Sequence, residues 1–310
     1  MWRWLVGFLV ALMGALWAYS AYHTSQIESN YPPTGQFVTV GDLRLHYIEA
    51  GSGSPVVLLH GAGANLNDWK MSLFAEAARN NRMIAFDRPG HGHSDRPAEQ
   101  GQDPRVQAAL IHDALTGMGV ERPVLVGHSW SGAVVLAYAL AYPDEVKGVL
   151  VLSGVSHDWE GSVRPSYRIA AAPVLGPVFR HTFMAAVGEW LLPSSVQSAF
   201  APNPPPADYI EKAQVRLLLR PQAFLNNARD IIDLRAALRE MSPDYGTISL
   251  PVIIVSGTED KWVDPELHAR KLNRAVPNSE LVLINSVGHM PHHVRPLLIA
   301  DAIRRLSREE

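Results

Sequence analysis

The chain has 310 residues, 47% of them hydrophobic and 18% charged, and its formal net charge at pH 7 is −3. These values predict a globular protein with a substantial core, built as one large domain with an insertion or as two domains. No block of like charge and no low-complexity tract is present, which argues against nucleic-acid binding, and the lack of cysteine excludes disulfides and thiolate catalysis.

The first predicted element is an apolar segment near the N-terminus. Residues 4–22 carry no charge, and their number is close to the roughly 20 that cross a bilayer as a helix. Arg3 precedes the segment, and aromatic residues lie near both of its ends. We expect residues 1–22 to be a single-pass membrane anchor, with the folded domain on the extracytoplasmic side. The alternatives are a signal peptide cleaved after residues 18–20, which would leave a secreted or periplasmic protein, and a buried helix.

The folded domain is expected to begin after a polar linker at residues 23–36. Two alternating strands are predicted within 37–50, and a short buried strand covers 56–60. The strand leads into Gly61-Ala62-Gly63. A dinucleotide site would need another glycine where Leu66 stands, so no cofactor of this kind is expected.

A loop rich in glycine and histidine follows the next helix and strand. The helix is predicted over 66–79, and the loop at 87–94 reads DRPGHGHS. Its glycines permit positive φ angles, which indicates a structural turn. We expect His91 and His93 to be structural, with substrate contact as the alternative. A further helix is predicted over 103–118.

The central stretch at residues 123–135 reads PVLVGHSWSGAVV. Its apolar run predicts a buried strand, and the residues after the turn can form a helix. A serine at a sharp strand-to-helix turn has the geometry of a nucleophile elbow, so Ser129 is the candidate nucleophile. Gly127 fits the pattern G-x-S-x-G, but Ser131 replaces its last glycine, which is displaced to Gly132.

On these residues the chain resembles the α/β-hydrolase superfamily, and specifically its capped serine-hydrolase members. The loop at 87–94 matches the D-x-x-G-x-G-x-S pattern of the same superfamily. The alternative is that the Gly-His-Ser turn around Ser129 occurs by chance in another kind of α/β protein. The resemblance implies an α/β-hydrolase fold, in which helices flank a mostly parallel central sheet, with an inserted helical cap and here an N-terminal hydrophobic helix. It also implies an oxyanion hole made by the backbone amides of Ala62 and Trp130.

The predicted alternation of strands and helices stops after a strand at 147–153. Residues 157–246 contain no convincing strand, but they contain many prolines and apolar helical segments. The resemblance implies that this insertion is the cap, or lid, and a second independent helical domain is the alternative. The hydrolase core is then expected at 37–156 and 247–310.

The candidate acid follows the strand predicted at 250–257. The sequence there matches the family pattern G-x-x-D-x-x-V-x-P, which implies that Asp260 is the acid of a catalytic triad. Glu259 and Asp264 are the competing carboxylates. Asp264 is better placed to cap the helix that follows it.

The candidate base follows the last predicted strand. His289 stands where the family has its catalytic histidine, and His292 and His293 are the alternatives. A histidine cluster also suggests a metal site, but adjacent histidines point apart and no H-E-x-x-H motif occurs, so no metal is expected. Val294 stands where the family often has glutamate, and an amphipathic helix over 296–310 closes the chain.

The order Ser129, Asp260, His289 is that of the α/β-hydrolases. The resemblance implies that His289 accepts the serine proton while Asp260 orients the imidazole. Dehalogenases and epoxide hydrolases of this fold have aspartate at the elbow, so Ser129 excludes them. We predict a cofactor-independent carboxylic ester hydrolase, esterase- or lipase-like, that forms an acyl-enzyme. A C–C bond hydrolase with the same triad and a non-catalytic ligand-binding member are the alternatives.

The substrate is expected to be a small apolar ester, because the predicted cap is rich in large apolar residues. His128, Phe183 and Trp190 are the candidate substrate-binding side chains. The alternative is that these residues only pack within the protein. The sequence does not determine the oligomeric state.

Overall fold

The computed structural model describes residues 1–308 and contains one sheet of eight strands. The strands are β1 (Gln36–Val40), β2 (Leu43–Ala50), β3 (Pro55–Leu59), β4 (Arg82–Phe86), β5 (Val124–His128), β6 (Gly148–Leu152), β7 (Val252–Gly257) and β8 (Ser279–Ile284). Their spatial order is β1-β2-β4-β3-β5-β6-β7-β8. Only β1–β2 and β2–β4 pair antiparallel. The expected mostly parallel sheet is confirmed.

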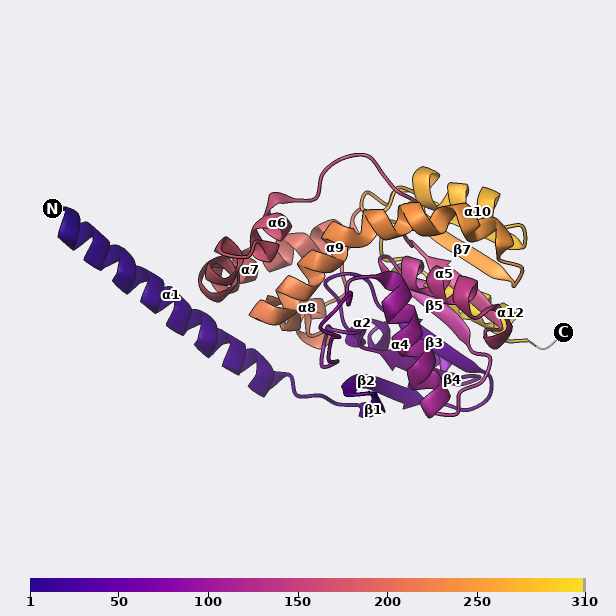
Figure 1. Ribbon diagram of the computed structural model, residues 1–310. Coiled ribbons are helices and arrows are strands. Elements are labelled where there is room, and N and C mark those ends of the chain that lie inside the picture. The colour runs from indigo at the N-terminus through magenta and orange to yellow at the C-terminus, as the bar shows by residue number, and fades with distance from the viewer. Residues whose placement is uncertain (309–310) are drawn as a thin grey trace.

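Helices cover both faces of this sheet (Figure 1). Outside the insertion the α-helices of the chain are α1 (Trp2–Asn30), which does not cover the sheet, and α2 (Asn67–Lys70), α3 (Phe74–Ala77), α4 (Pro104–Gly117), α5 (Ser131–Ala141), α10 (Lys271–Ala275), α11 (Pro291–Val294) and α12 (Pro296–Ser307). Val57 and Leu59 of β3 pack in the apolar cluster that includes α4 and α5. Val56 and Leu58 pack in the cluster that includes α12. Adjacent strand residues therefore face opposite helix layers, and β5 and β6 are buried throughout.

The helix predicted over 66–79 is divided in two. The side chain of Ser72 donates hydrogen bonds to the carbonyl oxygens of Asp68 and Trp69, each at 3.1 Å, and the chain turns between α2 and α3. Such local bonds compete with helix continuation. The apolar periodicity still predicts burial correctly, because Leu66, Trp69 and Leu73 are fully buried.

The insertion between β6 and β7 is helical, and residues 157–246 contain no strand. Its α-helices are α6 (Pro165–Ala171), α7 (Leu175–Phe200), α8 (Tyr209–Lys212) and α9 (Pro221–Met241), and the 3-10 helix η2 (Val215–Leu219) lies between α8 and α9. The prolines of the insertion interrupt fewer helices than their number suggests. Pro177 occupies the first turn of α7, where its missing N–H has no intrahelical partner, and Pro193 lies inside the same helix.

Helix α1 is longer than the predicted anchor. It continues to Asn30, so most of the segment expected to be a linker is helical. The cap holds this extension, because Ile27 is buried in an apolar cluster with cap residues and His23 is 3.1 Å from the Glu189 carboxylate. Figure 1 shows the N-terminal part of α1 projecting beyond the cap, away from the sheet.

Candidate active site

Ser129 lies between the end of β5 and the start of α5. Its φ of 54° is in the left-handed region, which is uncommon for a residue other than glycine and typical of strained functional turns. Its amide donates to the Leu152 carbonyl oxygen at 3.0 Å, and its own carbonyl oxygen accepts from the Gly132 amide at 2.9 Å. The serine hydroxyl therefore stands at the turn expected of a nucleophile elbow.

Small residues are needed at this turn because other backbone segments lie very close to it. A Cβ on Gly127 would lie 2.3 Å from the Ser131 carbonyl oxygen, and a Cβ on Gly132 would lie 2.7 Å from the Gly154 Cα. Ser131 is tolerated because its buried hydroxyl donates to the His60 carbonyl oxygen at 2.5 Å. Glycine is therefore required at position 132, where the backbone around Gly154 approaches closely, and not at position 131.

The three predicted triad residues form one hydrogen-bonded chain. The Ser129 Oγ is 2.9 Å from the His289 Nε2, and the His289 Nδ1 is 2.8 Å from the Asp260 Oδ2. The other carboxylate oxygen of Asp260 accepts from the amides of Trp262 and Val263 at 2.9 and 3.0 Å. The three residues follow β5, β7 and β8, so they meet beyond the carboxyl ends of parallel strands.

The competing carboxylates lie elsewhere. Asp264 accepts from the Glu266 amide at 2.8 Å, at the start of the next helical turn, as expected. Glu259 is exposed. Among the described residues, only Asp260 receives a hydrogen bond from His289.

The alternative histidines belong to a separate buried cluster around Asp68 of α2. Asp68 accepts from the Nε2 atoms of His292 and His293 at 2.9 and 2.7 Å, and from the Tyr209 hydroxyl at 2.6 Å. Burial alone would raise the pKa of Asp68, but the two histidines hold it well below its ordinary value. Both histidines therefore stabilise a buried carboxylate.

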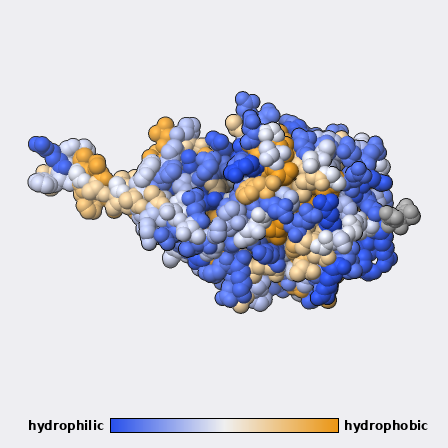
Figure 2. Space-filling view, turned by 90° about the horizontal axis from the view of Figure 1, so that it is seen from below, coloured by the Kyte–Doolittle hydropathy of each residue, from blue (hydrophilic) through white to orange (hydrophobic). Residues whose placement is uncertain are grey.

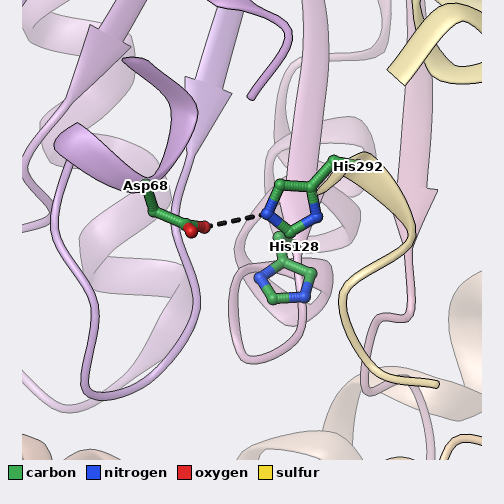
Figure 3. A group of neighbouring side chains, drawn as sticks. All are labelled: Asp68, His128 and His292. Atoms are coloured by element: carbon green, nitrogen blue, oxygen red, sulfur yellow. Dashed lines mark hydrogen bonds and ion pairs between the residues drawn. The ribbon is translucent and has the colours of Figure 1, made fainter. Parts of the chain in front are cut away.

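His128 lies behind the candidate base. It is buried, and its Nε2 donates to the His289 carbonyl oxygen at 2.9 Å. Figure 3 shows His128 beside His292, which points toward Asp68. Ligand atoms of these three residues lie within 4.8 Å of one another, but a metal ion would have to displace the hydrogen bond between Asp68 and His292. The absence of a metal stays a prediction.

The two amides assigned to the oxyanion hole flank the nucleophile. Ala62 follows β3, and Trp130 directly precedes α5. Neither amide donates a hydrogen bond within residues 1–308. A Cβ on Gly61 would lie 2.9 Å from the Ser129 Cβ, so only glycine allows this loop to approach the nucleophile. The two free donors near the serine fit the binding of a tetrahedral oxyanion.

The candidate substrate-binding side chains of the cap do not line an enclosed site. Phe183 and Trp190 are 42% and 79% exposed on the outer surface of α7. Helical periodicity explains this outcome, because the buried side of α7 is formed by Met184, Gly188 and Leu192. Substrate binding by Phe183 and Trp190 stays a prediction, and His128 is buried behind the base.

Other side chains lie closer to the site. The Trp262 ring is nearly parallel to the His289 ring, with 6.0 Å between centroids, and the Asn227 Oδ1 accepts from the Gly63 amide at 2.7 Å. Trp262 follows the candidate acid by two residues, so its position in the motif could have revealed it. Asn227 had no such signal, because it is far from Gly63 in the chain.

The buried pair of Arg88 and Asp230 was also not predicted. The Arg88 Nη1 lies 2.9 Å from the Asp230 Oδ2, and both side chains are almost completely buried. The His91 Nε2 is 2.8 Å from the same oxygen, which fits the structural role expected for this histidine.

Sequence comparison relates this chain to known proteins. A family model described as alpha/beta hydrolase fold matches residues 54–296. An uncharacterized protein of Mycobacterium tuberculosis is 31% identical over 288 residues, covering 88% of this chain and 81% of the relative. A 2-hydroxy-6-oxononadienedioate/2-hydroxy-6-oxononatrienedioate hydrolase of Comamonas testosteroni is 26% identical, covering 90% and 97%.

One similar solved structure matches nearly the whole chain. A structure described as a membrane phospholipase A, a bacterial virulence factor, has a TM-score of 0.67 and 21% identity. It covers 99% of this chain, and 98% of that structure is matched, which shows a shared fold. Because the family model spans most of the sheet and of the insertion, the chain belongs to the α/β-hydrolase fold family.

Proposed function

We propose that this protein is a membrane-anchored serine hydrolase that cleaves carboxylic esters through an acyl-enzyme on Ser129. The observation that carries the proposal is the hydrogen-bonded chain from Ser129 through His289 to Asp260, beside two unengaged backbone amides. Serine alone is a weak nucleophile, and an adjacent base oriented by a carboxylate is the arrangement that activates it.

The reaction follows from these positions. His289 Nε2 takes the proton of Ser129 as Oγ attacks the ester carbonyl, and the amides of Ala62 and Trp130 receive the developing oxyanion. Collapse of the tetrahedral intermediate breaks the C–O bond, and His289 returns its proton to the leaving alcohol. Water, activated by the same imidazole, then hydrolyses the acyl-enzyme. Asp260 holds the imidazole in one tautomer and orientation.

C–C bond hydrolysis is the second candidate, because the Comamonas testosteroni relative is named as a hydrolase of an oxo-dienedioate. A dicarboxylate substrate needs free cationic side chains at the site. Arg88 lies against Trp130 but is buried and paired with Asp230, so it is not free for this role. Arg164 is exposed instead, and its guanidinium lies 5.4 Å from the centroid of the Trp262 ring, which stacks on His289, so Arg164 is the candidate cation for a dicarboxylate substrate. Parallel assays with p-nitrophenyl esters and a 2-hydroxy-6-oxo-dienoate would separate the two reactions.

The mechanism is tested with a fluorophosphonate probe on the full-length protein in detergent. We expect labelling of Ser129 and of no other serine, no labelling of Ser129→Ala or His289→Ala, and slow labelling of Asp260→Asn. Ser131→Ala is the matched control, because this hydroxyl lies at the same turn but bonds to His60. Ester hydrolysis at the full rate by Ser129→Ala would refute the assignment.

The membrane location is supported by an apolar surface next to α1. Helix α1 is long and apolar enough to cross a bilayer, and its span is almost entirely exposed. The His181 ring stacks on Trp17 at 4.7 Å, and Glu189 meets His23, so α1 and α7 run in the same direction. The N-terminal end of α7 therefore lies toward the projecting part of α1. Figure 2 shows orange residues on this projection, beside a body that is largely blue.

Exposed apolar residues of the cap extend this surface. Val174, Leu175 and Val178 are exposed at the N-terminal end of α7. We infer that they rest on the bilayer that α1 enters, where their burial stabilises the contact. Arg3 precedes the span, which by the positive-inside rule supports an extracytoplasmic catalytic domain.

Vesicle flotation tests this contact. A protein that lacks residues 1–18 keeps the cap contacts of His23 and Ile27 and should still float with phospholipid vesicles, whereas adding Val174→Asp and Leu175→Asp to this truncated protein should prevent flotation. Leu297→Asp is the matched control, because Leu297 is 71% exposed but lies on α12. Equal flotation of all three proteins would show that the cap surface does not bind the bilayer. Recovery of a mature protein that begins near Ala21 would show a cleaved signal peptide in place of the anchor.

A further inference from the structure

Helix α9 of the cap presents a buried polar face to the hydrolase core. Asn226, Asn227 and Asp230 are each less than 5% exposed. Buried polar groups are costly unless they are hydrogen-bonded, so these three residues indicate specific contacts. Asn226 donates from Nδ2 to the Gly90 carbonyl oxygen at 2.8 Å, in the loop after β4. The other two residues reach the two halves of the oxyanion hole.

Asn227 holds the first half. The Gly63 amide donates to the Asn227 Oδ1 at 2.7 Å, directly after Ala62. On the other side, the His60 Nδ1 donates to the Gly61 carbonyl oxygen at 2.8 Å and so orients the peptide that carries the Ala62 N–H. Burial, followed by the charge of a neighbouring arginine, lowers the pKa of His60 to about 3, so the imidazole is neutral. Both peptides around Ala62 are therefore held.

Asp230 holds the second half. The Trp130 indole N–H donates to the Asp230 carbonyl oxygen at 3.0 Å, and the Arg88 guanidinium lies 4.2 Å from the centroid of the same indole ring. Arg88 is paired with the Asp230 carboxylate and donates from Nε to the His60 carbonyl oxygen at 3.0 Å. Through Arg88, Asp230 thus connects His60, at the end of β3, with Trp130, the residue after the nucleophile.

The charge on Asp230 is compensated inside the protein. Besides Arg88, its carboxylate meets the His91 Nε2 at 2.8 Å and the Arg96 Nη2 at 2.7 Å. Burial alone would raise the pKa of Asp230, but the hydrogen bond from His91 and the charges of the arginines lower it below the ordinary value. The carboxylate therefore remains ionised and keeps Arg88 against Trp130.

We propose that Asn227 and Asp230 are positioning residues for the oxyanion hole, so that cap helix α9 is a fixed wall of the catalytic site. The inference rests on the proposed serine-hydrolase function, because an oxyanion forms only in such a reaction. Among the hydrogen bonds of residues 1–308, neither side chain bonds to a triad residue. Their effect is to place two amides, and oxyanion donors act only when they lie within about 2.7–3.1 Å of the developing charge.

The test compares neighbouring amides of α9 in the full-length protein, with p-nitrophenyl butyrate as substrate. Asn227→Leu should lower kcat by about 10-fold or more and leave KM within about twofold, because the oxyanion is present only in the transition state. Asn227→Asp keeps the acceptor and should restore most of kcat. Asn226→Leu is the matched control. It removes a buried amide of the same helix, so its thermal stability should fall while its kcat stays near wild type.

Asp230 needs a second variant, because Asp230→Asn leaves Arg88 buried and unpaired and can prevent folding. Trp130→Phe removes three ring atoms of a buried side chain, including the indole nitrogen whose N–H reaches the Asp230 carbonyl oxygen, and it should lower kcat several-fold with little change in KM. Wild-type kcat in Trp130→Phe would overturn the role of Asp230.

The assignment of Asn227 fails if Asn227→Leu keeps full kcat, or if Asn226→Leu loses as much kcat at a temperature where both variants are folded. The proposed function is judged separately. If the wild-type protein is not labelled by fluorophosphonate at Ser129, the function itself is wrong. If Ser129 is labelled and kcat in Asn227→Leu is unchanged, only the positioning role is wrong.

Discussion

Replacing Asp68 by asparagine tests the buried cluster that joins α2, α8 and α11. The wild-type carboxylate accepts three hydrogen bonds, from His292, His293 and Tyr209. Asparagine is nearly the same size but has only one acceptor oxygen, so at least one buried donor loses its partner. Leaving a buried group unpaired costs about 1–3 kcal/mol, and hydrogen bonds to a charged group are about twice as strong as neutral ones.

We therefore expect Asp68→Asn to lower the free energy of unfolding by about 2–4 kcal/mol. In a thermal melt of the detergent-solubilised protein, this corresponds to a fall in Tm on the order of 5–10 °C. Asp208→Asn is the matched control. Asp208 lies beside α8, but it is 68% exposed and within residues 1–308 pairs only with Lys212, so loss of this ion pair should cost no more than about 0.5 kcal/mol.

The pH dependence has a defined sign. The pKa of Asp68 is lowered in the folded protein, so its contribution to stability is complete above the unfolded-state pKa of about 4 and is lost as the pH falls further. The difference in Tm between wild type and Asp68→Asn should therefore be largest near neutral pH and shrink below about pH 4. A variant that melts with the wild type at every pH would refute the description of Asp68 as a buried anion with three donors.

Two other predictions concern the elbow and the N-terminus. Gly132→Ala places a Cβ 2.7 Å from a backbone Cα and should cost about 1–3 kcal/mol or more, whereas Gly117→Ala meets nothing within 4 Å and should not destabilise the protein in the same melt. Deleting residues 1–30 removes Ile27, which is 3% exposed in the cap cluster, and should lower Tm below that of a protein that lacks residues 1–18; equal Tm values would show that α1 does not support the cap.

The sequence by itself predicted the order of the strands and the candidate reacting groups. Each motif is local: the turn around Ser129 and the loops with Asp260 and His289 all follow buried strands that apolar runs predict. Parallel strands bring their carboxyl ends to one edge, so the three residues were expected to meet, and the structure places them within hydrogen-bond distance.

Only the tertiary structure decided how the cap relates to this site. Phe183 and Trp190 have the apolar character of pocket residues, yet the orientation of α7 turns them outward, and hydropathy alone does not report which face of a helix is covered. The contact between Arg88 and Asp230 joins residues 142 positions apart. A pairing over such a distance leaves no local periodicity in the sequence, because it is set by the packing of α9 on the core.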